Sequence, residues 1–221
     1  MIDTILFDLD GTIVDTNELI ITSFLHVLEK HGASTPEQPY TREQIIPYMG
    51  MTLEQQLQQF TGAGDLTQLV KDYRAYNTEH HDHMVKEFPH VYEVISKLHE
   101  KGITLGVVTT KMKPSTMRVL ELFGLLKFMD TIVTLNDVEH PKPDPEPVLT
   151  AVDRLKADPA RTLMVGDSPA DILSAKAAGV HSAAVAWSLK GAEKLKTYEP
   201  DYILKDMTDL YDLLGWEPAN L

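Results

Sequence analysis

The acidic residues that follow the first apolar run have types and a spacing that could do chemistry. In "TILFDLDGT", Asp8 and Asp10 stand two positions apart where the apolar run meets Gly11 and Thr12. Two neighbouring carboxylates repel each other and are costly to remove from water, so we expect a cation beside them. Ligands of open α/β sheets bind at the carboxyl ends of the strands, which is where this pair would lie.

Other polar residues stand at the ends of later apolar runs or close to them. They are Thr109, Thr110, Lys142, Asp167 and Asp171. Carboxylate oxygens with room for water suit Mg²⁺, and a carboxylate beside Mg²⁺ and lysine suits phosphoryl transfer. Each residue alone is typical of an ordinary loop or surface. Their joint occurrence at predicted strand ends favours a single site, to which backbone N–H groups around Gly11 would add donors.

The elements that must position these residues alternate along the chain. Short, continuously apolar runs, typical of strands buried on both faces, cover residues 4–8, 103–110, 130–135, 161–167 and 181–187, with a weaker one at 201–204. Helix-like patterns cover residues 90–102, 113–124, 145–157 and 168–179. The alternation predicts an α/β fold with a doubly wound parallel sheet.

One long interval interrupts this alternation and predicts an inserted helical cap over residues 15–84. Its first helix would bury Ile20, Phe24, Val27, Leu28 and His31 on one face, and further helical patterns follow at 52–60 and 65–76. The core would then comprise residues 1–14 and 85–221.

Composition excludes several classes of function. Lys and Arg number 20 against 33 Asp and Glu, a formal charge of −13, and the basic residues are scattered singly. Nucleic acids and anionic membranes are therefore poor partners. No cysteine is present, which excludes thiolate catalysis and sulfur-ligated metals. No apolar stretch is long enough to span a bilayer and no secretory leader is visible, so we expect a cytoplasmic protein that acts as a monomer.

The residues together resemble the haloacid dehalogenase superfamily of phosphotransferases. "DLDGT", Thr109, Lys142 and "GDSPAD" are similar to its four motifs and occur in the same order. The resemblance implies that Asp8 is the nucleophile that becomes an aspartyl phosphate, and that Asp10 protonates the leaving oxygen and then deprotonates water. It also implies that Thr109 and Lys142 bind the phosphoryl oxygens, with Thr110, Gly11 and Lys111 as further substrate-binding residues. The metal residues would be Asp8, Asp10 (through its carbonyl), Asp167 and Asp171, with Asp171 restraining metal-bound water or Lys142.

Stretches outside these motifs narrow the resemblance. "DTNELIITSFLH", "NTEHHDHMVKEF" and "VAWSLKG" are similar to the PpaX-type inorganic pyrophosphatases. This implies Mg²⁺-dependent hydrolysis of a small phosphorylated substrate, pyrophosphate. Phosphoglycolate phosphatases and capped phosphosugar mutases share the core residues and stay open as alternatives. A receiver-type signalling domain is disfavoured, because it needs neither a second carboxylate two residues after the first nor a cap.

Two features of the cap region allow more than one interpretation. Three histidines close in sequence, as at His80, His81 and His83, could indicate a metal site. At these positions of a helix, however, the side chains would not point at one ion, so a solvated hinge between cap and core is favoured. One of these imidazoles, with Asn17 or Lys111, would otherwise approach a distal phosphate, as would Lys113. Gly50 and Thr52 fit either a loop that closes over the site or a helix start with Thr52 as its N-cap.

Overall fold

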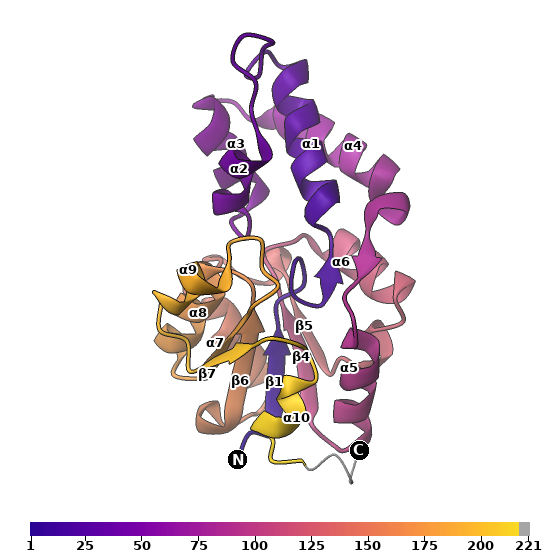
Figure 1. The fold of residues 1–221 in the computed structure, drawn as a ribbon, viewed down its shortest axis with the longest axis vertical. Coiled ribbons are helices and arrows are strands. Elements are labelled where there is room, and N and C mark those ends of the chain that lie inside the picture. The colour runs from indigo at the N-terminus through magenta and orange to yellow at the C-terminus, as the bar shows by residue number, and fades with distance from the viewer. Residues whose placement is uncertain (217–221) are drawn as a thin grey trace. The chain divides into compact units, whose positions relative to one another are not determined.

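The chain divides into two compact units in the computed structural model, which describes residues 1–216. The first unit comprises Met1–Val14 and the chain from Glu87 onward, and the second comprises Asp15–Lys86 (Figure 1). The second crossing therefore falls after Lys86, slightly later than the expected boundary after Met84. At the two crossings, strand β2 (Val14–Asp15) pairs with strand β3 (Lys86–Glu87).

A six-stranded sheet forms the centre of the first unit. Its strands are β1 (Thr4–Phe7), β4 (Thr104–Val108), β5 (Thr131–Val133), β6 (Thr162–Gly166), β7 (His181–Val185) and β8 (Tyr202–Leu204). They lie in the order β5-β4-β1-β6-β7-β8, and every neighbouring pair is parallel. This confirms the predicted doubly wound α/β fold.

Helices connect these strands and cover the sheet. They are α5 (Val91–Glu100), α6 (Lys113–Leu122), α7 (Glu146–Leu155), α8 (Pro169–Ala178), α9 (Ala192–Lys196) and α10 (Asp209–Leu213), with short 3-10 turns at Leu126–Phe128, Leu135–Asp137 and Pro159–Arg161. Leu6 of β1 packs in one buried cluster with Val148 of α7 and Ala175 of α8. Helices α5 and α6 lie on the opposite face of the sheet from α7 and α8 (Figure 1). The chain runs from β1 through β4 to β5 in one direction across the sheet and from β6 through β7 to β8 in the other, and right-handed crossovers then place the two pairs of helices on different faces.

Strand β1 lies where the strand order reverses. The chain passes from β1 to β4 on one side, and later returns to β6 on the other. Phe7 stands level with Val107 of β4 and with Val165 of β6. The residues just after these three strands therefore meet at one edge of the sheet, at the switch point where ligands of such folds bind.

The second unit is helical. It contains α1 (Asn17–Lys30), α2 (Arg42–Ile45), a 3-10 turn at Ile46–Tyr48, α3 (Leu53–Thr61) and α4 (Thr67–Met84). Phe24 of α1 packs against Phe60 and Tyr73, with ring centroids 5.3 and 4.6 Å away. The helical unit thus has a hydrophobic core of its own, and the apolar face predicted for the first helix packs into this core.

Two residues of that predicted face lie differently. Phe24, Val27 and Leu28 are fully buried, but Ile20 is only partly buried. His31 is exposed, because α1 ends at Lys30, and its Nε2 lies 2.8 Å from Asp72 Oδ2. Placing His31 on the buried face was therefore wrong.

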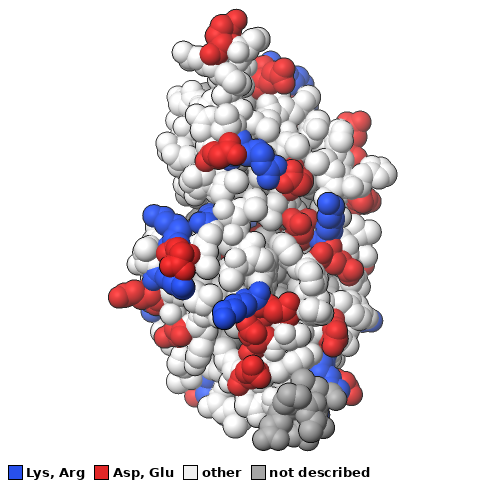
Figure 2. All heavy atoms as spheres, viewed as in Figure 1, with Lys and Arg blue, Asp and Glu red and all other residues white. Residues whose placement is uncertain are grey.

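The surface and the helices also bear on possible partners. On the face that Figure 2 draws, Lys and Arg side chains lie among Asp and Glu and form no continuous basic band over the described residues. Among residues 1–216, no helix has the length and apolar character that crossing a membrane requires.

Candidate active site

Asp8 is the first residue after β1 and lies at the centre of the site. Its backbone N–H donates to the Val165 carbonyl at 2.8 Å, which continues the register with β6. The residue is only 8% exposed, and its Oδ2 accepts a 3.4 Å hydrogen bond from Thr12 Oγ1. The carboxylate is thus fixed at the carboxyl end of the central strand.

Gly11 shapes the turn that follows. Its φ of 81° lies in the left-handed region that favours glycine, and its N–H donates to the Val14 carbonyl at 2.8 Å. The Gly11 N–H is therefore used within the turn, and substrate binding by Gly11 and by other N–H groups around it stays a prediction.

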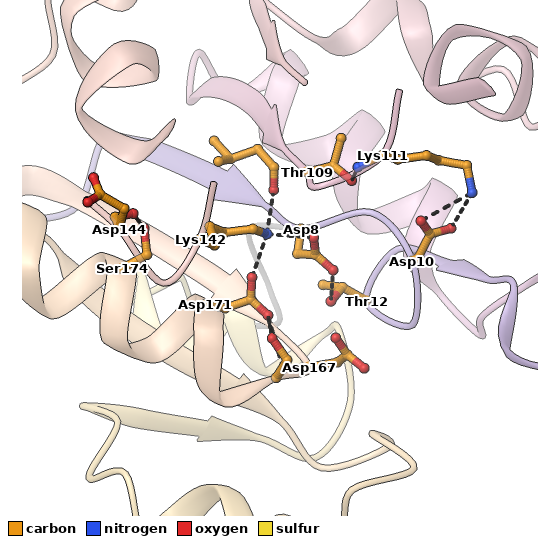
Figure 3. Close-up of polar contacts among 12 residues, drawn as sticks. Asp8, Asp10, Thr12, Thr109, Lys111, Lys142, Asp144, Asp167, Asp171 and Ser174 are labelled. Carbon is orange, nitrogen blue, oxygen red and sulfur yellow. Dashed lines mark hydrogen bonds and ion pairs between the residues drawn. The ribbon is translucent and has the colours of Figure 1, made fainter. Parts of the chain in front are cut away.

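Lys142 is the cation beside Asp8. Its Nζ donates to Asp8 Oδ1 at 2.7 Å, to Asp171 Oδ1 at 2.6 Å and to the Val108 carbonyl at 2.8 Å (Figure 3). An ammonium has three protons, so all of its donors are used. The Lys142 side chain is 2% exposed, and a buried charge with this set of partners holds the neighbouring carboxylates in place.

Asp171 is fixed from both sides. Its Oδ2 accepts hydrogen bonds from the Ser168 N–H at 3.0 Å and from Ser168 Oγ at 2.7 Å, in a capping box that starts α8. A Cβ atom at Gly166 would lie 2.3 Å from the Asp171 side chain. Glycine at the end of β6 is therefore required for this carboxylate to sit against Lys142.

Asp10 has a different cation. Lys111 Nζ donates to its two carboxylate oxygens at 2.9 and 3.2 Å (Figure 3). The Lys111 backbone N–H donates to Thr109 Oγ1 at 3.1 Å, which ties the loop after β4 together. Thr109 is buried and Thr110 is half-buried in this loop. The two carboxylates of "DLDGT" are thus stabilised by separate lysines.

Three buried carboxylates form a group that could hold a metal ion. Asp8, Asp167 and Asp171 each offer an oxygen, and these oxygens lie within 4.8 Å of one another. The Asp10 carboxylate lies outside this group and pairs with Lys111, whereas the expected metal contact of Asp10 was through its carbonyl and stays a prediction. Hard oxygen donors gathered in this way fit a divalent cation such as Mg²⁺.

The pKa values of the group also fit a divalent cation bound to it. Burial raises the pKa of Asp8 above its ordinary range, and Lys142 offsets this only in part, while Asp171 and Asp167 raise it further. Burial likewise raises the pKa of Asp167 to about 6, although Lys190 and Lys142 lower it. Burial alone would lower the pKa of Lys142, but Asp171 and Asp8 together raise it. Lys142 alone therefore does not keep the Asp8 pKa low, and a cation would be needed.

The segment after β7 contributes site residues that sequence reasoning did not assign. Ser188 Oγ donates to the Asp167 carbonyl at 2.6 Å, and Lys190 Nζ lies 4.0 Å from Asp167 Oδ2. Trp187 Nε1 donates to the Thr12 carbonyl at 3.3 Å. Their position could have indicated a role in the site, because this segment follows a predicted strand at the same edge of the sheet.

The histidines of α4 differ in their exposure to solvent. His80 stacks on Tyr76 with ring centroids 4.0 Å apart, and His81 is 2% exposed with its Nδ1 2.6 Å from Asp82 Oδ1. All three histidines lie in the last turns of α4, and only His83 is exposed. The expectation that these histidines are solvated was therefore wrong for His81, and a hinge at this point stays a prediction. Within residues 1–216 the histidines belong to no metal-holding group.

Thr52 begins a helix. It is the N-cap of α3, where its side chain accepts from the Gln55 N–H at 3.3 Å and Gln55 Oε1 accepts from the Thr52 N–H at 3.0 Å. This confirms the interpretation of Gly50 and Thr52 as a helix start with Thr52 as its N-cap.

The fold and the site together define a class of enzyme. The family model described as haloacid dehalogenase-like hydrolase matches residues 5–185, and the chain belongs to this family. It is a hydrolase, and more specifically a phosphatase of that family.

Among known proteins, the chain is similar over almost its whole length to two named pyrophosphatases. It is 46% identical over 216 residues to the pyrophosphatase PpaX of Bacillus velezensis and 47% identical over 214 residues to that of Anoxybacillus flavithermus, and each alignment covers 97% of both chains. A solved haloacid dehalogenase-like hydrolase from Bacteroides fragilis is 33% identical, with a TM-score of 0.84 over 95% of this chain and 100% of that one.

Proposed function

We propose that this protein hydrolyses inorganic pyrophosphate to phosphate through an aspartyl phosphate on Asp8, with Mg²⁺ bound. The observation that carries the proposal is the buried Asp8 carboxylate, which Lys142 orients at the switch point beside Asp167 and Asp171. The substrate follows from similarity to relatives that are named pyrophosphatases.

In the first step, an oxygen of Asp8 attacks one phosphorus of pyrophosphate. An O–P bond to Asp8 forms while the bond to the bridging oxygen breaks, and Asp10 gives its proton to the departing phosphate. Thr109 Oγ1 already accepts from the Lys111 N–H, so its own hydroxyl proton can be donated to a phosphoryl oxygen. Lys142 keeps Asp8 in place and adds positive charge beside the reacting phosphorus.

In the second step, water attacks the aspartyl phosphate. Asp10, now ionised, takes a proton from the water as the new O–P bond forms and the bond to Asp8 breaks. Lys111 pairs with Asp10 and would stabilise this ionised form. Asp8 is restored as a carboxylate and the second phosphate leaves.

Asp8, Asp167 and Asp171 are the carboxylates that would hold or surround Mg²⁺. When bound, the ion would neutralise charge on the phosphoryl group and favour the ionised form of Asp8.

The experiment that tests this function is a panel of substrates with the purified protein and Mg²⁺. We expect kcat/KM for pyrophosphate to exceed the values for phosphoglycolate, hexose phosphates and p-nitrophenyl phosphate. A tenfold preference for phosphoglycolate would contradict the proposed substrate and leave the phosphatase assignment intact.

Metal dependence is tested in the same assay. EDTA should abolish activity and Mg²⁺ should restore it, whereas Ca²⁺ should fail because its looser coordination misplaces the reacting groups. Full activity in metal-free buffer would contradict the role of the three carboxylates.

A further inference from the structure

Lys190 is a largely covered lysine that the steps above do not use. Its side chain is 6% exposed, close to the 2% of Lys142. The two lysines differ in their partners. Lys142 Nζ makes three hydrogen bonds of 2.6–2.8 Å, whereas Lys190 Nζ makes none with any residue in 1–216 and has Asp167 Oδ2 at 4.0 Å as its ion-pair partner. The Lys190 Nζ atom retains contact with solvent, so its three donors are accessible to an anionic ligand.

The backbone fixes Lys190 at the site. The Lys190 N–H donates to Ser188 Oγ at 3.1 Å, and the same hydroxyl donates to the Asp167 carbonyl at 2.6 Å. The Gly191 N–H donates to the Ser188 carbonyl at 3.0 Å, which closes the turn. These bonds fix the Lys190 backbone, and its ammonium lies 4.0 Å from Asp167 Oδ2, one carboxylate of the group of Asp8, Asp167 and Asp171.

Each lysine of the site has different carboxylate partners. Lys142 is used by Asp8 and Asp171, and Lys111 donates to both oxygens of Asp10. Lys190 alone keeps its donors for a further anion. It follows β7, so it reaches the group from the side of the sheet opposite to Thr109 and Lys111, which follow β4.

We propose that Lys190 binds the second phosphate group of a diphosphate substrate and is thus a specificity-determining residue; this rests on the function proposed above. A phosphate monoester brings one phosphoryl group, for which Asp8, Thr109 and Lys142 are in place. A diphosphate brings additional negative charge beside the acidic group, and Lys190 supplies the matching cation.

The test compares Lys190→Met with the parent on two substrates, pyrophosphate and p-nitrophenyl phosphate, whose leaving group has no second phosphate. We expect kcat/KM for pyrophosphate to fall at least 100-fold and that for p-nitrophenyl phosphate to fall less than tenfold. Lys190→Arg should recover part of the lost preference because it keeps the charge. Lys196→Met, on an exposed lysine of α9, is the matched control and should change neither value. Equal losses on both substrates, or no loss, would overturn the proposal.

A binding measurement separates this proposal from the proposed function. Methylenediphosphonate, which cannot be hydrolysed, and orthophosphate are each titrated calorimetrically into parent and Lys190→Met in Mg²⁺. We expect the Kd of methylenediphosphonate to rise at least 30-fold and that of orthophosphate less than threefold. If the parent fails to hydrolyse pyrophosphate, the proposed reaction is wrong, and this titration still decides the role of Lys190. Equal changes in Kd for both ligands, or a changed Mg²⁺ affinity without phosphate, would mean that Lys190 acts on Asp167 and does not bind the second phosphate group.

Discussion

The two aspartates of "DLDGT" have separate lysine partners, so their substitutions should have different consequences. Asp8→Asn should abolish turnover, because an amide cannot attack phosphorus. Asp10→Asn should slow the attack of water more than the first step, so that aspartyl phosphate accumulates. Steady-state rates and the intact mass after acid quenching measure both effects.

The control for these variants is Asp153→Asn, an exposed residue of α7. It removes the same charge away from the site and should leave the rate unchanged. Activity of Asp8→Asn within tenfold of the parent would remove Asp8 as the nucleophile.

Gly166 permits the approach of Asp171 to Lys142, and a single methyl group tests this. In Gly166→Ala the new Cβ would lie 2.3 Å from the Asp171 side chain, which must then shift. We expect kcat to fall at least 100-fold and the protein to lose on the order of 2 kcal/mol of stability, the size of effect that overpacking produces. Rates and urea denaturation curves provide the measurement.

Gly64→Ala is the matched control, because nothing lies within 4 Å of a Cβ at that position. An active Gly166→Ala protein would mean that the placement of Asp171 does not matter for turnover.

Site residues in the four recognised motifs were accessible from the sequence, whereas Lys190, outside those motifs, was not. Asp8, Lys142 and Asp171 were predicted to share one site, and in the structure both carboxylates accept hydrogen bonds from Lys142. Lys190 stands between an exposed leucine and a glycine in a loop, a context typical of surface lysines. Only the fold shows that this side chain is buried against Asp167.

At the scale of elements, long periodic segments were predictable and short ones were not. The continuously apolar strands β1, β4, β5, β6 and β7 were recognised because both of their faces are buried. The pair β2 and β3 and the helices α9 and α10 escaped recognition, since two to five residues are too few to show a period. Their structure depends on contacts made elsewhere in the fold.

The start of α3 depends on a local device that can be tested alone. Thr52 and Gln55 satisfy two backbone N–H groups through their reciprocal hydrogen bonds. Thr52→Ala should cost about 1 kcal/mol, and Thr52→Ser should restore most of it. Urea denaturation followed by circular dichroism measures the difference, and equal stability of the two variants would show that the capping box contributes little.

At the scale of the whole molecule, the buried carboxylates couple stability to pH and metal. Burial raises the pKa of Asp167 to about 6 and that of Asp8 above its ordinary range, so without metal the folded protein binds these protons more tightly than the unfolded chain. Their contribution to stability is complete below about pH 4; that of Asp167 is lost as the pH rises through about 6, and that of Asp8 as the pH rises through about 8. A bound cation would replace the protons at higher pH.

We therefore expect Mg²⁺ to raise the melting temperature more at pH 8 than at pH 5.5, relative to EDTA. Differential scanning fluorimetry at both values, with and without Mg²⁺, provides the measurement. Asp167→Asn removes one of the titrating groups and should reduce the difference between the two pH values. An equal Mg²⁺ shift at both pH values in the parent would contradict the linkage.

The hydrogen bond from Trp187 to the Thr12 carbonyl gives the site an optical signal of its own. The chain has two tryptophans, and the other, Trp216, stacks on Tyr211 near the end of the described residues. Replacing Trp216 by Phe would leave the emission of Trp187 alone, from an indole attached to the turn that carries Asp8 and Asp10. Changes in that turn could then be followed in a stopped-flow instrument without an added label, including in variants that no longer turn over.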